Sequence, residues 1–265
     1  MRLRSVPLAL GVIWLAATAG AWPGSLTQPL TRDARRLVPR SLALLIADRE
    51  ARLLDESRRL PPEISRALAV DQMGGRLSAP TLAAADALIA ETIALLKQGR
   101  VTEGIARFGA LLRIPADLSD PALCVGAEGF PSGVVREYYA FVETNLAKVP
   151  VVLDERAALT LTRPQLATYW QGLLAKSRSE APVIRAELFR DGRLVDHSRI
   201  DYRSPVFAVG ALSYSRAVTA VAATWLVAWR EARGDLTRMP TAREVRPSEG
   251  APAAVPRLSP EVRTP

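Results

Sequence analysis

Hydrophobic residues recur at three- and four-residue spacing along most of the chain, a period that predicts amphipathic helices rather than strands. Ser78 is expected to cap one of these helices, and Gly99 stands where a left-handed terminal residue belongs. We read 73–75 (MGG) as a loop and expect a short hairpin turn at Asp191-Gly192. The expected helices span 30–38, 41–59 (with Ser41 as its cap), 80–98, 102–113, 134–147, 164–177, 182–189 and 206–233.

The last of these segments is long and apolar, so it could be a core helix or a membrane span. Ser213, Tyr214, Ser215 and Arg216 interrupt its apolar residues, which favours a buried core helix. Gly210 could divide it into two pieces.

Both ends of the chain differ from this helical pattern. Arg2 and Arg4 precede an apolar run at 6–17 and an A-x-A motif ending at Ala21, which together predict a secretory signal peptide. The alternative is an uncleaved leader that anchors the protein to the inner membrane. The leader would then be the protein's only contact with the membrane. From about position 241 prolines dominate and large apolar residues are scarce, which predicts disorder. The expected organisation is a signal peptide at 1–21, a helical domain at 22–240 and a disordered tail at 241–265, in a protein exported to the periplasm or secreted.

Charge and rare residues exclude several kinds of site. The formal charge is +8, from 35 basic and 27 acidic residues, and the two signs are interspersed. No nucleic-acid-binding patch is therefore expected. The sequence names no partner, and we expect a monomer. Cys124 is the only cysteine and His197 the only histidine. We expect Cys124 to be a small buried residue and His197 to lie in a surface turn, because one His and one Cys cannot build a conventional multi-zinc centre.

One stretch resembles a unit of a helical repeat. The segment ALLKQGRVTEGIARFGALLRIPAD has a helix, a small-residue turn, an amphipathic helix and a proline. A solenoid needs at least about three such units, and no second copy is found at a similar spacing. A repeat array is therefore disfavoured, although a helical interaction module remains an alternative.

A different resemblance emerges from four features in order. Trp22 follows the A-x-A motif directly, RIPAD contains x-x-x-D ending at Asp117, ADLSDPAL follows, and YAFVE ends at Glu143. This layout resembles the zinc-dependent phospholipase C and single-strand-specific nuclease superfamily. Its members are exported all-helical proteins, and their mature N-terminal Trp binds zinc through its amino group and carbonyl. The resemblance implies an all-α fold, a single multi-helix domain of the phospholipase C type.

The same comparison shows where ligand histidines would be missing. The positions of the family's histidines are occupied by Thr27, Arg113, Ser119, Leu123 and Tyr139. Leu cannot bind zinc, and the fixed charge of Arg would repel it.

A remnant of the metal site would consist of Trp22, Asp117 and Glu143, which could hold at most one hard cation weakly. No cofactor is therefore assigned, with residual zinc or another divalent cation as the alternative. Asp117 paired with Arg113, and Glu143 hydrogen-bonded to Tyr139, would instead be purely structural. We expect Trp22, Arg113, Asp117, Tyr139 and Glu143 to converge on one pocket.

The leading hypothesis is an exported, catalytically degenerate protein on this scaffold with a binding role. The alternatives are a divergent phosphodiester hydrolase with a reduced metal site, and an unrelated helical interaction module.

Overall fold

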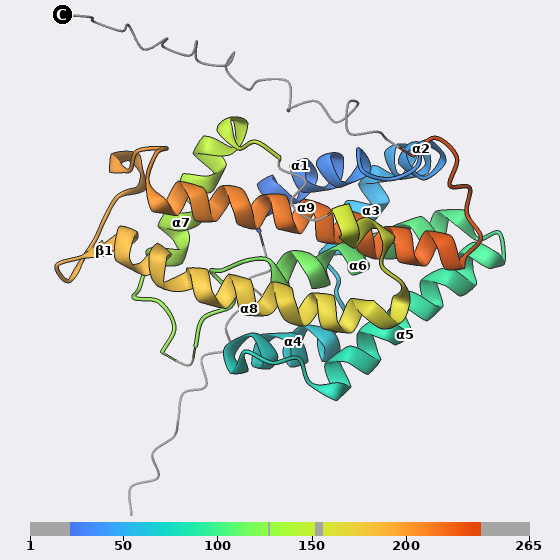
Figure 1. Ribbon diagram of the computed structural model, residues 1–265, viewed down its shortest axis with the longest axis horizontal. Helices are drawn as coiled ribbons and strands as arrows, with labels where there is room; N and C mark the ends of the chain where they lie inside the picture. The colour runs from blue at the N-terminus through green and yellow to red at the C-terminus, as the bar shows by residue number, and fades with distance from the viewer. Residues whose placement is uncertain (1–21, 127, 152–155, 240–265) are drawn as a thin grey trace, which may run out of the picture.

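The computed structural model describes residues 22–126, 128–151 and 156–239, and this part of the chain is almost entirely helical (Figure 1). The expected leader at 1–21 and the whole of the expected tail at 241–265 lie outside the described residues. The all-α class is thus confirmed. The helices are α1 (Gly24–Arg35), α2 (Arg40–Asp48), α3 (Glu50–Ser57), α4 (Pro62–Gly74), α5 (Ala79–Lys97), α6 (Val101–Leu118), α7 (Val134–Asn145), α8 (Arg163–Leu188) and α9 (Pro205–Glu231). Short 3-10 turns η1 (Leu146–Lys148), η2 (Arg156–Thr160) and η3 (His197–Arg199) and a two-stranded hairpin, β1 (Phe189–Arg190) with β2 (Arg193–Leu194), complete it.

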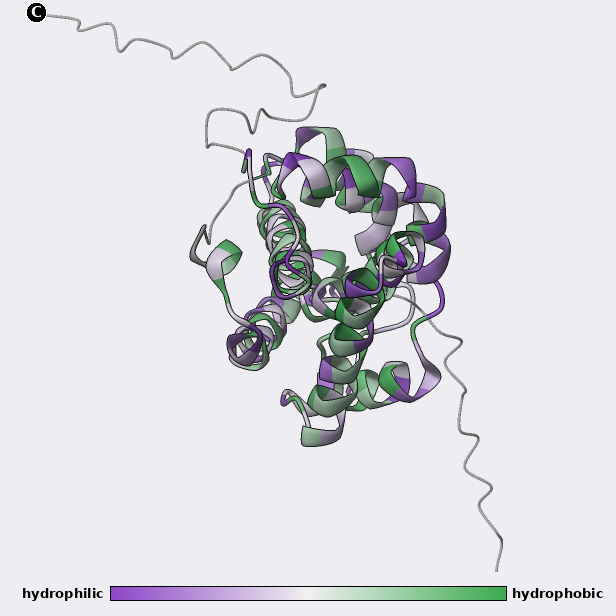
Figure 2. Ribbon diagram, turned by 90° about the vertical axis from the view of Figure 1, so that its right-hand side faces the viewer, coloured by the Kyte–Doolittle hydropathy of each residue, from purple (hydrophilic) through white to green (hydrophobic). Residues whose placement is uncertain are grey.

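Helix α9 is the centre of the fold. It packs against α1, α6 and α8, and every side chain from Ser213 to Trp229 is buried. The ring of Trp225 stacks on Phe108 of α6, and its indole N–H donates to the Phe108 carbonyl at 2.9 Å. Figure 2, a view along the long axis of Figure 1, shows hydrophilic residues mainly on the outer sides of the helices. The 206–233 segment is therefore a core helix, as expected, and it continues through Gly210.

One buried ion pair joins α9 to α8. Arg216 is 7% exposed, and its guanidinium donates to both carboxylate oxygens of Glu180, with Nη1 at 2.8 Å from Oε1. The two charges compensate each other where solvent has little access, since the Arg216 and Glu180 side chains are 7% and 19% exposed.

Two described helices, α5 and α9, are long and apolar enough to cross a membrane by length and composition. In α9, 78% of the apolar window is buried inside the protein, against 39% in α5.

Helices α3 and α6 approach closely because of one glycine. An ideal Cβ placed on Gly109 would lie 2.0 Å from the backbone carbonyl oxygen of Leu53. Any side chain at this position would force the two backbones apart.

Several predicted boundaries are wrong, and tertiary burial explains most of the differences. Helix α6 continues through Pro115 and α8 through Pro182, although proline removes a helical hydrogen bond. In α6 the residues after the expected end, including Ile114 and Leu118, are fully buried, which offsets that loss. Conversely, the expected helix 41–59 is broken at Arg49, whose backbone leaves the helical region at φ −119°.

The other differences lie at helix ends. Pro39 caps α2, and the Ser41 hydroxyl donates to the carbonyl of Asp235 instead of capping. Helix α1 begins at Gly24, earlier than expected, and α4 was not predicted and includes most of the expected 73–75 loop. The predicted Ser78 cap, the left-handed Gly99 (φ 75°) and the hairpin are confirmed.

Candidate functional site

The indole of Trp22 is inserted into the core just before α1 begins. Trp22 is 3% exposed, and its ring meets Tyr214 of α9 edge-on at 6.0 Å and Tyr139 of α7 at 6.5 Å between centroids. The hydroxyl of Thr27, one turn into α1, lies 3.5 Å from the Trp22 carbonyl oxygen. The residue predicted to begin the mature chain is thus fixed between three helices.

A fully buried carboxyl group, that of Asp120, lies beside the Trp22 backbone. The Tyr139 hydroxyl donates to Oδ2 of Asp120 at 2.7 Å, and the Ala122 N–H donates to Oδ1 at 2.9 Å. The backbone N–H of Trp22 donates to the same carboxyl group. We call this set of four residues the Asp120 cluster.

Burial raises the pKa of Asp120 to about 7, because its hydrogen bonds from neutral donors only partly compensate for lost hydration. The nearby Asp117 carboxylate raises it further. Burial likewise raises the pKa of the Tyr139 hydroxyl well above its usual value. Near neutral pH, Asp120 is therefore divided between its protonated and ionised forms, and Tyr139 remains a neutral donor.

Asp117 is held by Arg113 one turn earlier on α6. The guanidinium donates from Nε at 3.1 Å and from Nη2 at 3.3 Å to the two carboxylate oxygens, and Nη1 donates to the Ser57 carbonyl of α3 at 3.1 Å. Burial opposes the charge on Arg113, but the Asp117 carboxylate outweighs it and raises the pKa of the guanidinium. The predicted i, i+4 pair is thus confirmed.

Glu143 does not join the others. Its side chain is exposed on α7 and accepts a hydrogen bond from the Ser25 hydroxyl. The expected bond between Glu143 and Tyr139 is wrong, because the Tyr139 hydroxyl points to Asp120 instead.

Ser119 and Leu123, two of the positions where ligand histidines are expected to be replaced, serve the local fold. The buried Ser119 hydroxyl donates to the Pro115 carbonyl of its own helix at 2.8 Å. Leu123 packs against the hydrophobic core.

The five residues predicted to converge on one pocket form two neighbouring pairings instead, Arg113 with Asp117 and Tyr139 with Asp120, and Glu143 belongs to neither. Trp22 and Tyr139 meet directly at Asp120, and the Arg113–Asp117 pair lies close enough to influence the ionisation of both Tyr139 and Asp120. Sequence reasoning assigned no role to Asp120. The available signal was its position three residues after Asp117, in a segment otherwise rich in apolar residues.

This donor set does not fit a zinc ion. The carboxylate of Asp117 is occupied by a guanidinium, and Glu143 faces solvent. Arg113 brings a fixed positive charge into the position where a cation would bind.

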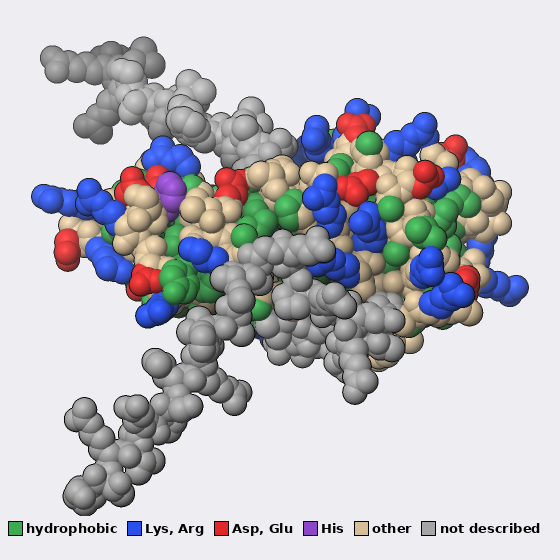
Figure 3. Space-filling view, turned by 90° about the horizontal axis from the view of Figure 1, so that it is seen from above, with side chains coloured by type: hydrophobic (Ala, Val, Ile, Leu, Met, Phe, Trp, Pro, Cys, Tyr) green, Lys and Arg blue, Asp and Glu red, His purple; other side chains and the backbone are tan. Residues whose placement is uncertain are grey.

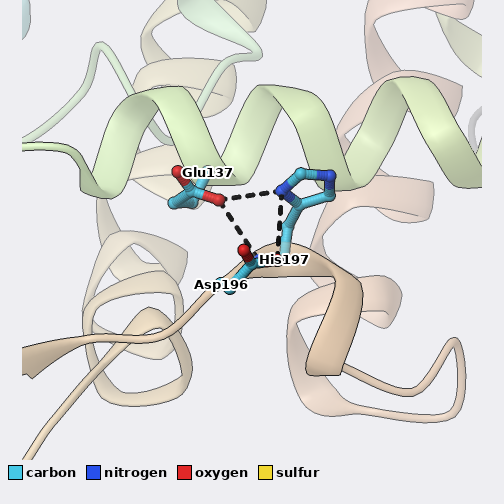
Figure 4. A group of neighbouring side chains, drawn as sticks. All are labelled: Glu137, Asp196 and His197. Carbon is cyan, nitrogen blue, oxygen red and sulfur yellow. Dashed lines mark hydrogen bonds and ion pairs between the residues drawn. The ribbon is translucent and has the colours of Figure 1, made fainter.

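A second polar cluster lies where η3 meets α7 (Figure 4). Oε2 of Glu137 lies 2.8 Å from Nδ1 of His197 and accepts the His197 backbone N–H at 3.2 Å, and the Asp196 carboxylate is the third member. These hydrogen bonds, with Arg136 on the other oxygen, lower the pKa of Glu137. His197 is thus partly exposed, as expected of a turn residue, but it also fastens η3 to α7.

Among the described residues, these three are the one group whose donor atoms lie close enough together to hold a metal ion. Each donor already has a protein partner, since Asp196 caps the Ser198 N–H at 2.8 Å and Glu137 is bound to His197. Fastening η3 to α7 accounts for the positions of Glu137, Asp196 and His197.

Two of the cavities in the described part of the chain lie away from the Asp120 cluster. One of about 480 Å³ lies between α5 and α6 and is lined by charged residues such as Arg107, and one of about 320 Å³ lies beside α8 near Phe130 and Arg185. Figure 3 shows basic and acidic side chains mixed over one face of the molecule.

Cys124 is fully buried, and burial raises the pKa of its thiol well above the usual value. It is an inert core residue, as expected.

None of the family models, curated proteins or solved structures compared with this chain matches it.

Proposed function

We propose that this chain is an exported, non-catalytic helical protein that has the scaffold of the zinc-dependent phospholipase C and nuclease superfamily and uses it for binding. In this proposal, the position of the metal centre is filled by the Asp120 cluster and the Arg113–Asp117 pair. The leader at 1–21 directs export.

The observation that carries the proposal is the meeting of Trp22, Tyr139 and the x-x-x-D helix at a buried carboxyl group. Trp22 and Tyr139, which the resemblance places at the metal centre, lie far apart in the sequence and come together at Asp120, although Glu143 does not join them. Coincidence would not be expected to bring the Trp after the A-x-A motif to the helix that bears Asp117.

The same geometry argues against hydrolysis. A phosphodiester must reach a metal-activated hydroxide in an open coordination position. Here Asp120 is 0% exposed and Asp117 7% exposed, and both carboxylates are engaged by protein donors. A reduced site made of Trp22, Asp117 and Glu143 would need Glu143 to leave Ser25 and turn inward.

The test is metal analysis of the exported, purified protein together with hydrolysis of bis(p-nitrophenyl) phosphate in the presence of added zinc. We expect zinc well below one ion per chain and turnover no higher than that of Asp117→Asn, the matched variant. One zinc per chain together with turnover that Asp117→Asn abolishes would overturn the proposal in favour of the hydrolase.

The mass of the exported chain tests the proposed cleavage of the leader before Trp22. A mature chain that begins at Trp22 is expected. A start several residues to either side would remove the support that Trp22 gives to the family resemblance.

A further inference from the structure

The Asp120 cluster has an unusual charge balance for the interior of a protein. Asp120 is 0% exposed, and three uncharged groups donate to it: the Tyr139 hydroxyl, the Ala122 N–H and the Trp22 N–H. A buried carboxylate is costly unless a cation accompanies it. These three hydrogen bonds satisfy the carboxylate oxygens of Asp120 but do not neutralise its charge.

One of those three donors changes chemically when the leader is removed. The A-x-A motif places the cut between Ala21 and Trp22. Hydrolysis breaks the amide C–N bond: water gives its hydroxyl to the Ala21 carbonyl carbon and a proton to the Trp22 nitrogen. The new α-amine has an ordinary pKa of about 7.7–8.0 and takes up a further proton from solvent at neutral pH. A neutral donor with one N–H thus becomes a cation with three.

We propose that removal of the leader creates a buried ion pair between the α-ammonium group of Trp22 and the carboxylate of Asp120, so that proteolytic processing completes the core of the folded protein. The Trp22 nitrogen already donates to this carboxyl group, and the indole, packed on Tyr139 and Tyr214, holds it there.

The pair also reverses the effect of pH on stability. With the amide intact, the folded pKa of Asp120 lies above its unfolded value, so stability is highest at acid pH and is lost as pH rises through the folded pKa. With the ammonium group beside it, the carboxylate is favoured in the folded state. The mature chain then gains stability as pH rises past the unfolded pKa of Asp, and loses it only when the amine deprotonates.

This inference rests on the proposed export and cleavage, so the experiment uses chains with defined N-termini. Three full-length mature forms are compared: one that begins at Trp22, one that retains Ala21, and one with an acetylated Trp22 nitrogen. Each is made with Asp120 and with Asp120→Asn, and urea unfolding is followed at about pH 5 and about pH 7.5.

At neutral pH we expect the chain that begins at Trp22 to have an unfolding equilibrium constant at least about tenfold smaller than those of the two blocked chains. Asp120→Asn should raise the unfolding constant of the free-amine chain and should lower or leave unchanged that of the blocked chains. If Asp120→Asn changed the unfolding constants of all three N-terminal forms equally, the proposed ion pair would be overturned.

Asp33 provides the matched control. It is a partly buried aspartate, with its side chain 13% exposed, and it too accepts a hydrogen bond from a tyrosine hydroxyl, that of Tyr214, at 2.9 Å; burial raises its pKa. Asp33→Asn should act equally on all three N-termini.

A second measurement does not depend on any variant folding. The α-amine of the wild-type mature chain should react with formaldehyde and cyanoborohydride at least about tenfold more slowly than that of the urea-unfolded chain. Reaction at the unfolded rate would overturn the proposal. The protection should also survive EDTA, and protection lost with a released metal ion would assign the amine to a metal and would refute the proposed non-catalytic function as well.

Discussion

Substituting Arg113 tests whether the region around Asp117 is as dry as the structure indicates. Arg113→Met keeps much of the side-chain volume but removes the guanidinium that bonds to both oxygens of Asp117 and to the Ser57 carbonyl. The Asp117 carboxylate would then remain in the protein interior without its counter-ion.

The structure sets the expected magnitude. The side chains of Arg113 and Asp117 are 17% and 9% exposed, so solvent screens their interaction only in part. Removing one partner of a buried pair costs about 3–5 kcal/mol, and we take the lower end, about 3 kcal/mol, for this partial exposure. That loss corresponds to roughly a hundredfold rise in the unfolding equilibrium constant and shifts the urea midpoint by about 1 M.

The assay is urea unfolding of the wild type, Arg113→Met, and the double variant Arg113→Met/Asp117→Leu. The double variant should recover most of the loss, since it leaves no uncompensated charge. Without the guanidinium, the folded pKa of Asp117 should lie above its unfolded value, so the deficit of Arg113→Met should grow as pH rises. A deficit below about 1 kcal/mol, or a double variant no better than the single one, would refute the reasoning.

Three other predictions concern the frame around the cluster. Gly109→Ala should destabilise the protein by about 3 kcal/mol in thermal unfolding, because its Cβ would collide with the α3 backbone. The control Gly172→Ala in α8 has open space around the new methyl group and should stabilise the protein by up to about 1 kcal/mol. Equal effects of the two substitutions would contradict the close α3–α6 approach. The thiol of Cys124 should react with Ellman's reagent only after unfolding, and rapid reaction of the native protein would show that this region opens. His197 holds the pKa of Glu137 low, so its contribution to stability is present above the unfolded pKa of Glu and lost as pH falls through the folded value; His197→Ala should lose less stability on acidification than the wild type.

Much of the helical frame could be predicted from local rules. Spacing of apolar residues located most of the helices, and the i, i+4 distance correctly paired Arg113 with Asp117. Proline rules misplaced the ends of α6 and α8, because they describe the cost of a lost hydrogen bond and not the buried contacts that outweigh it. Those contacts come from α9 and other helices distant in sequence.

The central residue of the site could not be predicted in the same way. A carboxylate just after the end of a helix and before a proline usually faces water, whereas Asp120 is 0% exposed and bonded to Tyr139 of a helix distant in sequence. Glu143 lies one turn after Tyr139 on α7, yet its side chain is exposed while that of Asn145, two residues further on, is buried. Helical spacing specifies which face of a helix a residue lies on, whereas how deeply its side chain is buried depends on the elements that pack against that face.

The Arg216–Glu180 pair has a consequence before folding is complete. Helix α9 is apolar enough to partition into a bilayer, and a chain exported as proposed would present it unfolded to the membrane. An arginine near the centre of such a segment opposes insertion by about 2.5–3.5 kcal/mol. Glu180 lies on a different helix and reaches Arg216 only in the assembled fold. The charge of Arg216 would therefore oppose insertion of α9 into the lipid bilayer while the chain is being translocated. Glu180 neutralises this charge once α8 and α9 have packed together.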